Sequence, residues 1–200
     1  MSSSDEVQPE ESREFRGGLL LGAERGSDPV EVVDYDPAWP ARFEAMRAKL
    51  AASLGSVALR IDHVGSTAVP GLPAKPVVDI QLSVADVEDI DAYRAGIEAH
   101  GIVLRYVEPG HRYFRPRPGV PRLWQIHVCQ ADSDWERAHL LFRDYLRARS
   151  DVAADYAAMK YRVAREFPDD RIAYNDAKAP WIEATLRDAE AWATSTGWRP

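Results

Sequence analysis

Hydrophobic and polar residues alternate along several short runs of the chain. The clearest run covers residues 78–84, where valine, isoleucine and leucine share one face while Asp79, Gln81 and Ser83 share the other. A period of two residues is that of a β-strand with one buried face. On this basis we predict strands over 30–33, 57–63, 78–84, 102–107 and 122–129.

Other segments show the helical spacing of three and four residues. A first helix is predicted to start at Asp36–Pro37 and to end at Gly55, because proline fits the first turn and glycine suits the position after the last. Its buried face consists of Phe43, Met46, Leu50 and Leu54. A second helix is predicted over 86–99, ending near Gly101.

From Ser133 onward the pattern is helical. Ser133 and Glu136 have the spacing of a capping box, in which two side chains bind backbone N–H groups at a helix start. Two more helices are predicted, one from about 151 to Phe167–Pro168 and one over 174–193, with Pro180 as a kink or a new start. Strands first and helices last predict an α+β fold with a mixed sheet.

Two segments show neither period. Residues 1–28 are rich in serine, glutamate, glycine and arginine, which predicts a disordered tail before a single domain over 29–200. The segment 108–121 is interrupted by prolines and glycines, which predicts a long hairpin or loop.

The composition indicates a globular protein outside the membrane. Of the 200 residues 46% are apolar, and no apolar run approaches the roughly 20 residues that cross a bilayer. The N-terminus lacks the basic and then apolar layout of a secretory signal, and the single Cys129 has no partner for an internal disulfide. We therefore expect a cytoplasmic protein.

The net charge of -7 argues against general nucleic-acid binding, because affinity for phosphate backbones comes from clustered lysine and arginine. The segment 105–122 differs from the rest of the chain in its charge. Its basic residues, opposed by Glu108 alone, are Arg105, His111, Arg112, Arg115, Arg117 and Arg122. We expect Arg112 and Arg115 to bind an anionic ligand, and the alternative is that they are solvated.

A turn formed by Gly65, Ser66 and Thr67 precedes the strand that carries Asp79. Its N–H groups and hydroxyls can hold phosphate oxygens, and Lys75 on the connection can pair with a phosphate. Asp79 lies on a strand with a buried face, where a carboxylate needs a cation, a basic partner or open water. A salt bridge to an arginine of the hairpin is the structural alternative.

This block resembles the GrpB family, whose members carry His-x-Gly-Ser-Thr-x-Val-Pro-Gly-Leu-x-x-Lys-Pro-x-x-Asp. The matching residues are His63, Gly65, Ser66, Thr67, Val69, Pro70, Gly71, Leu72, Lys75, Pro76 and Asp79. Tyr35, Asp36, Trp39 and Pro40 resemble the family's Tyr-Asp-x-x-Trp-Pro entry. Over about 30–190 the resemblance implies a nucleotidyltransferase-like fold, with helices flanking the sheet and a helical C-terminal part. The family also occurs fused to dephospho-CoA kinase.

The segment from Tyr174 to Lys178 also resembles a segment of that family. The resemblance implies that Lys178 contributes to the phosphate site. The alternative is an ordinary surface lysine on a helix.

Enzymes of the nucleotidyltransferase superfold bind two metal ions through an acid-x-acid pair and a third acid on a neighbouring strand. Here the pair is Asp79 and Gln81, and the candidates on the neighbouring strand are Gln125 and His127, so two of the three carboxylates are absent. The resemblance therefore implies a reduced metal site with one Mg²⁺ or Mn²⁺, held by Asp79 with His127, and with His63 as a further candidate ligand. The alternative for each histidine is a packed core residue.

Two functional hypotheses follow. In the first, the protein is an enzyme that transfers a nucleotidyl or related group, with Asp79 and His127 as catalytic residues. In the second, it is a non-catalytic module that binds a nucleotide or another phosphorylated ligand through the Gly-Ser turn, Lys75 and the arginines. The sequence leaves both open.

Overall fold

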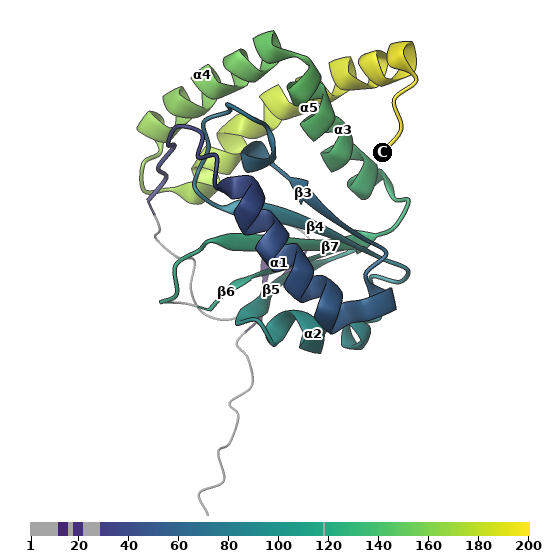
Figure 1. Ribbon diagram of the computed structural model, residues 1–200. Helices are drawn as coiled ribbons and strands as arrows, with labels where there is room; N and C mark the ends of the chain where they lie inside the picture. The colour runs from purple at the N-terminus through teal and green to yellow at the C-terminus, as the bar shows by residue number, and fades with distance from the viewer. Residues whose placement is uncertain (1–11, 16–17, 22–28, 118) are drawn as a thin grey trace, which may run out of the picture.

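A mixed sheet of seven strands forms the centre of the computed structural model, which describes residues 12–15, 18–21, 29–117 and 119–200 (Figure 1). The strands are β1 (Ser12–Phe15), β2 (Gly18–Leu21), β3 (Arg60–Val64), β4 (Val78–Val84), β5 (Ile102–Glu108), β6 (His111–Pro116) and β7 (Trp124–Gln130). Their order across the sheet is β1-β2-β5-β6-β7-β4-β3. Neighbouring strands are antiparallel, except that β4 and β7 are parallel.

The parallel pairing of β4 with β7 brings two polar strand faces together. Asp79 pairs with Gln125, and Gln81 pairs with His127. Because residues two apart on a strand share a face, these four side chains lie on the same face of the sheet.

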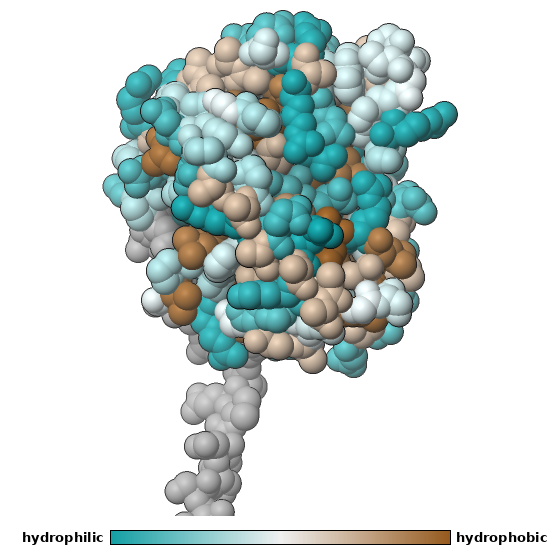
Figure 2. All heavy atoms as spheres, viewed as in Figure 1, coloured by the Kyte–Doolittle hydropathy of each residue, from teal (hydrophilic) through white to brown (hydrophobic). Residues whose placement is uncertain are grey.

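The opposite face of the sheet is apolar and packs against α1 (Trp39–Leu54) and α2 (Arg94–Glu98). The buried residues of α1 include Phe43, Met46, Leu50 and Leu54, as the spacing predicts. Burial of each such side chain contributes roughly 1.5–3 kcal/mol. Helix α1 lies in front of the sheet in Figure 1, and this side of the molecule is mainly hydrophilic, with scattered hydrophobic residues, in Figure 2.

The C-terminal part contains α3 (Asp134–Ala148), α4 (Ser150–Glu166) and α5 (Arg171–Thr196). These helices form a second core with the loop that follows the Gly-Ser turn, through Val69, Leu72, Tyr156, Met159 and Tyr174. The predicted α+β fold, a mixed sheet flanked by helices with a helical C-terminal part, is confirmed. No helix in the described part of the chain is both long and apolar enough to cross a membrane.

The predicted helix ends agree with the local hydrogen bonds. Gly55 ends α1 with a φ of 53°, which glycine adopts without strain. Ser133 Oγ accepts the N–H of Glu136 at 3.2 Å, and the Glu136 carboxylate accepts the N–H of Asp132 at 2.7 Å. Asp170 caps α5 by accepting N–H groups of its first turn.

Two elements near the start differ from the prediction. Residues 30–33 form only a bridge between Val33 and Ala74, and the N–H of Val30 donates to the carbonyl of Pro168 instead of to a strand. Helix α1 begins at Trp39, after a turn that the carboxylate of Asp36 supports by accepting the N–H of Ala38.

The segment 108–121, predicted as a long hairpin or loop, contains β6. Its prolines flank the strand rather than interrupt it, since Pro109 lies in the turn after β5 and Pro116 ends β6. The helix predicted over 86–99 is reduced to a 3-10 turn at Ile90–Ala92 and to α2. Pro180 lies inside α5, which continues past it.

Two strands also lie within residues 1–28, for which we predicted a disordered tail. β1 and β2 pair with each other, and β2 joins the sheet by pairing Leu19 with Val107 and Leu20 with Tyr106. The prediction is corrected for these two strands. The other residues of that tail lie outside the described residues.

Candidate functional site

A cavity of about 580 Å³ lies between the polar face of the sheet and the C-terminal helices. Strands β4 and β7 contribute Asp79, Gln125 and His127 to its lining. The Gly-Ser turn lines one side, and Tyr174 and Lys178 of α5 line another. Two blocks that lie far apart in the sequence therefore meet at one site.

Gly65 is required for the approach of this turn to Asp79. Its φ is 70°, and a Cβ atom at this position would lie 2.3 Å from Asp79 Oδ2. Atoms this close would clash, so a side chain at position 65 would displace the carboxylate. The residues that follow, Ser66–Ala68, form a single 3-10 turn.

The side chains of Thr67 and His63 stabilise the turn through hydrogen bonds and ring stacking. Thr67 Oγ1 donates to the carbonyl of Val77 at 3.3 Å and lies 2.9 Å from His63 Nε2. The imidazole of His63 stacks on Phe43, and burial lowers its pKa to about 4. His63 is therefore a neutral, packed side chain, and it does not line the cavity.

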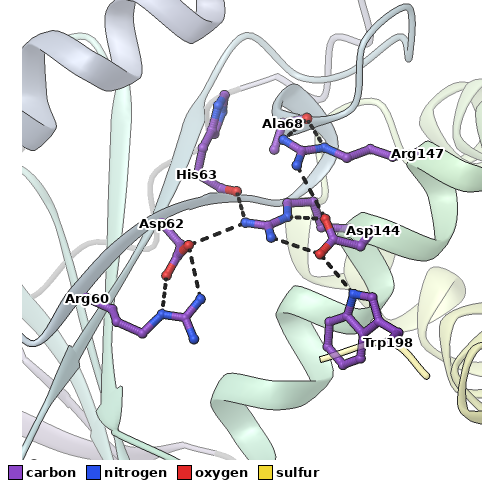
Figure 3. A network of polar contacts seen from close by, with 8 residues as sticks. Arg60, Asp62, His63, Ala68, Asp144, Arg147 and Trp198 are labelled. Atoms are coloured by element: carbon purple, nitrogen blue, oxygen red, sulfur yellow. Dashed lines mark hydrogen bonds and ion pairs between the residues drawn. The ribbon is translucent and has the colours of Figure 1, made fainter. Parts of the chain in front are cut away.

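Side chains of helix α3 donate hydrogen bonds to the backbone of the same turn (Figure 3). Arg147 donates two hydrogen bonds to the carbonyl of Ala68, at 3.0 and 2.8 Å, and Arg143 donates to the carbonyl of His63 at 3.2 Å. The carboxylate of Asp144 accepts from both guanidinium groups. These bonds fix the Gly-Ser turn to a rigid element.

A chain of hydrogen bonds links Glu108 through His111 to His127, which lies beside Asp79. Glu108 Oε1 lies 2.7 Å from His111 Nδ1, and His111 Nε2 lies 3.0 Å from His127 Nδ1. His127 Nε2 then lies 3.8 Å from Asp79 Oδ1. The ring of Trp135 stacks on His111, with centroids 4.6 Å apart.

This chain fixes the tautomers of both histidines. The Glu108 carboxylate only accepts, so His111 donates from Nδ1 and accepts at Nε2. Burial, with a smaller effect of His127, lowers the pKa of His111 to about 2 and keeps the ring neutral. His127 must then donate from Nδ1. When the ring of His127 is neutral, its Nε2 therefore carries the lone pair on the side of Asp79.

Three of the four lysines of the chain line this cavity: Lys75, Lys160 and Lys178. Mainly through burial, their pKa values are lowered to about 6, 7 and 8 in that order, and a neighbouring cation lowers each further. The ammonium groups of Lys75 and Lys178 lie 4.6 and 4.3 Å from the ring centroid of Tyr174. Among the described residues, no carboxylate forms an ion pair with either.

Four arginines add charge that persists at all ordinary pH values: Arg105, Arg115, Arg122 and Arg171. Arg105 and Tyr106 are consecutive residues of β5, which would face opposite sides of a regular strand. Both nevertheless line the cavity. The register of β5 shifts between Leu104 and Tyr106, and such an irregularity changes the direction in which side chains point. Seven basic side chains thus face Asp79 and Glu108.

Most of the ligand-binding and catalytic residues predicted from the sequence lie together in this cavity. They are Gly65, Ser66, Thr67, Lys75, Asp79, Arg115, His127 and Lys178. Arg112 does not line it, and instead pairs with Glu88 and donates to the carbonyls of Glu108 and His111. The structure adds Lys160, His111 and Arg171, which sequence reasoning did not assign. The scarcity of lysine in the chain is a signal that could have found Lys160.

The residues present do not form the two-metal centre of the nucleotidyltransferase superfold, as the sequence predicts from its missing carboxylates. Gln81 is fully buried and does not line the cavity, and Gln125 supplies an amide instead of a carboxylate. The structure also separates His63 from the pair of Asp79 and His127. In the described part of the chain, no three His, Cys, Asp or Glu side chains are grouped so as to hold a metal ion.

Comparisons with known proteins show the family of this chain. The family model described as GrpB protein matches residues 29–188. UPF0157 protein BH1888 of Halalkalibacterium halodurans is 32% identical, over 96% of this chain and 98% of its own. The crystal structure of conserved protein GrpB from Enterococcus faecalis has a TM-score of 0.71 and 32% identity, and the match covers 81% of this chain and 99% of that one.

Other relatives are longer than this chain. A dephospho-CoA kinase of Mycolicibacterium paratuberculosis is 35% identical, over 86% of this chain and 49% of its own length. UPF0157 protein YqkA of Bacillus subtilis is 31% identical, over 82% of this chain and 48% of its own length. The chain therefore spans about half the length of these two relatives. The family model covers strands β3 to β7, the Gly-Ser turn, α4 and most of α5, and the chain belongs to the GrpB family.

Proposed function

We propose that this cavity binds a phosphorylated small molecule of nucleotide size. The observation that carries the proposal is the concentration of positive charge, since four arginines and Lys178, whose pKa stays at about 8, line one cavity of a chain with a net charge of -7, together with Lys75 and Lys160. Buried cations repel one another and lose hydration, which costs free energy. An anionic ligand would offset that cost.

The shape and lining of the cavity support a ligand with a planar group beside its phosphates. The volume lies within the range of about 300–1,000 Å³ that is typical of small-molecule sites. Aromatic rings, on which bases can stack, are contributed by Tyr106, Tyr113, Phe142, Tyr156 and Tyr174. The name of the longer relative, dephospho-CoA kinase, supports the same ligand class. A cytoplasmic location, predicted from the sequence, would give access to such ligands.

Calorimetric titration of the full chain with ADP, pyrophosphate and adenosine tests the proposal. We expect ADP and pyrophosphate to bind, and adenosine to bind at least about tenfold more weakly, because charge pairing is worth more than about 1.4 kcal/mol here.

Two lysine variants make the titration specific to the cavity. Lys178→Met should weaken pyrophosphate binding, and higher salt should weaken it further, because both attractions are ionic. Lys49→Met, on the exposed side of α1, is the matched control and should bind like the wild type. Equal affinity of all three proteins at low and high salt would contradict the proposal.

Nucleotidyl transfer is a second candidate, favoured by the hydrogen bonds that run from Glu108 through His111 to His127, which lies beside Asp79. In this reaction His127 Nε2 takes the proton of an acceptor hydroxyl, whose oxygen attacks a phosphorus atom of the nucleotide while pyrophosphate leaves. Asp79, 3.8 Å away, stabilises the imidazolium. His111 and Glu108 hold His127 in the tautomer that this step requires.

Release of pyrophosphate from nucleoside triphosphates, with candidate acceptor hydroxyls and Mg²⁺ or Mn²⁺, tests transfer. Turnover should fall by about 10²–10⁴-fold in His127→Gln, because a general base contributes that much. Pyrophosphate binding should persist in this variant. Binding without turnover in the wild type would support the non-catalytic module instead.

A further inference from the structure

Lys75 has a chemical property that the arginines around it lack. Four arginines already supply fixed positive charge to the cavity. A lysine in the same place adds charge only when it is protonated, but its neutral form presents a nitrogen lone pair. The chain has only four lysines among its 25 basic residues of lysine and arginine type, so three in one cavity is a marked concentration.

The surroundings of Lys75 favour the neutral amine. The side chain is half-buried, lines the cavity and lies against the ring of Tyr174. Lys178 and Arg171 of α5 and Arg122 before β7 act on it as like charges, and Asp79 acts on it as an opposite charge. Burial and these cations lower the pKa of Lys75 to about 6. Near pH 7 the amine is therefore mostly unprotonated and open to the cavity.

We infer that Lys75 is a nucleophilic amine that forms an imine with the carbonyl carbon of a small molecule that also carries a phosphate. The inference rests on the proposed anion site, because the arginines must hold the phosphate while the amine reacts. It adds a reactive group and a substrate class, phosphorylated aldehydes and ketones, to that site.

The step balances without any further reactant. The lone pair of Lys75 Nζ forms a bond to the carbonyl carbon, and the carbonyl oxygen takes up a proton. The nitrogen then gives one of its two protons to that oxygen, which leaves the carbon as water, and returns the other to the group that protonated the oxygen, so that a neutral C=N bond remains. Lys178, whose pKa is lowered to about 8 and whose ammonium lies against the same Tyr174 ring, can supply the proton to the oxygen.

Borohydride trapping tests the inference on the full chain. The protein is incubated at pH 7 with pyridoxal 5′-phosphate or glyceraldehyde 3-phosphate, reduced with sodium borohydride and mapped by peptide mass spectrometry. We expect the reduced adduct at Lys75 to exceed that at Lys49 by at least about tenfold, because only an unprotonated amine attacks a carbonyl. Pyridoxal, which has no phosphate, should label Lys75 less.

Two variants and one matched ligand separate the outcomes. Lys75→Arg keeps a positive charge and should lose the adduct, whereas Lys49→Arg should keep it. Even labelling of all four lysines, or a main adduct at Lys178, would overturn the inference. Pyridoxine 5′-phosphate, which has no carbonyl, tests the anion site alone. If it binds and neither aldehyde is trapped, the imine is wrong and the proposed function stands; if no phosphorylated probe binds, the proposed function itself fails.

Discussion

Asp79 owes its position to the absence of a side chain at residue 65. The carboxylate occupies the space in which a Cβ atom of that residue would lie, so the turn and the strand approach more closely than two ordinary residues allow. The same glycine has a positive φ, which other residues adopt only with strain. One residue therefore sets both the path of the turn and the place of the acid.

Replacing Gly65 with alanine should destabilise the protein and weaken pyrophosphate binding. Gly71→Ala is a matched control, because Gly71 also has a positive φ but has no atom within 4 Å of the added methyl group. We expect a loss of about 1–2 kcal/mol for Gly71→Ala from backbone strain alone, and a larger loss for Gly65→Ala. Urea unfolding of both variants measures the difference, and equal losses would mean that contact with Asp79 has no cost.

The placement of Arg112 and Arg115 shows what residue patterns could and could not predict about the site. The Gly-Ser turn, Lys75 and Asp79 were found because they follow one another in a recognisable block. The two arginines were assigned together because their segment was interpreted as a long hairpin or loop, without a register that separates its two faces. On a strand, residues three apart face opposite sides, so Arg115 lines the cavity and Arg112 cannot.

The lowered pKa of Lys160 predicts how stability depends on pH. In the folded protein its pKa is about 7, whereas an unfolded lysine titrates near 10.5, so the unfolded chain binds more protons between these values. Stability should therefore rise as pH increases from 7 to 9, by up to about 1.4 kcal/mol per pH unit for this group. Lys160→Met should reduce that slope, and Lys49→Met should leave it unchanged. Thermal melting at several pH values provides the comparison, and identical slopes in wild type and Lys160→Met would contradict it.

At the scale of elements, helix α3 acts as a clamp on the turn that carries the site. It reaches the turn through side chains of two arginines one helical turn apart, which bind backbone carbonyls rather than other side chains. These bonds therefore hold the backbone of the turn directly.

Arg147→Met should lower stability by about 1–2 kcal/mol, because it leaves the carbonyl of Ala68 without its two hydrogen bonds. Arg149→Met is the control: Arg149 pairs with exposed Asp151, and its loss should change stability less than the loss of Arg147 does. Urea unfolding and pyrophosphate titration of both variants check this. If Arg147→Met binds pyrophosphate as tightly as the wild type, the clamp does not shape the site.

Elements were predictable where their signals are local. The glycine after α1 and the capping box of α3 depend on a few adjacent residues, and both were found. A strand depends on a partner elsewhere in the chain. Residues 30–33 have a strand-like composition but bond to Pro168 and Ala74, whereas β6 lies between prolines yet finds β5 and β7 on its two sides.

On the scale of the whole molecule, charge of the two signs is unevenly distributed. The chain has 25 lysines and arginines against 32 acids, and seven of the basic residues line one cavity. The residues outside the cavity therefore carry a more negative net charge than the chain as a whole. A small anion can enter the cavity, but a polymer of phosphates must also meet the acidic surface.

We therefore expect fluorescently labelled ADP to bind at physiological salt and labelled duplex DNA not to bind. Fluorescence anisotropy with equal concentrations of the two probes measures both. Lys178→Met should weaken the binding of ADP and leave the DNA signal unchanged. DNA binding comparable to that of ADP would show that the basic side chains form an open surface.

The parallel pairing of β4 with β7 has a consequence for the order in which the protein folds. Ser83 and Cys129, which pair across the two strands, are 46 residues apart in sequence. Closing so long a loop costs entropy before any contact repays it, so such pairs form slowly compared with hairpins such as β5–β6. The floor of the cavity consists of this pair, and the helix that completes it is the last element of the chain. A nascent or partly refolded chain should therefore possess most of its helices and hairpins before it has any affinity for phosphate.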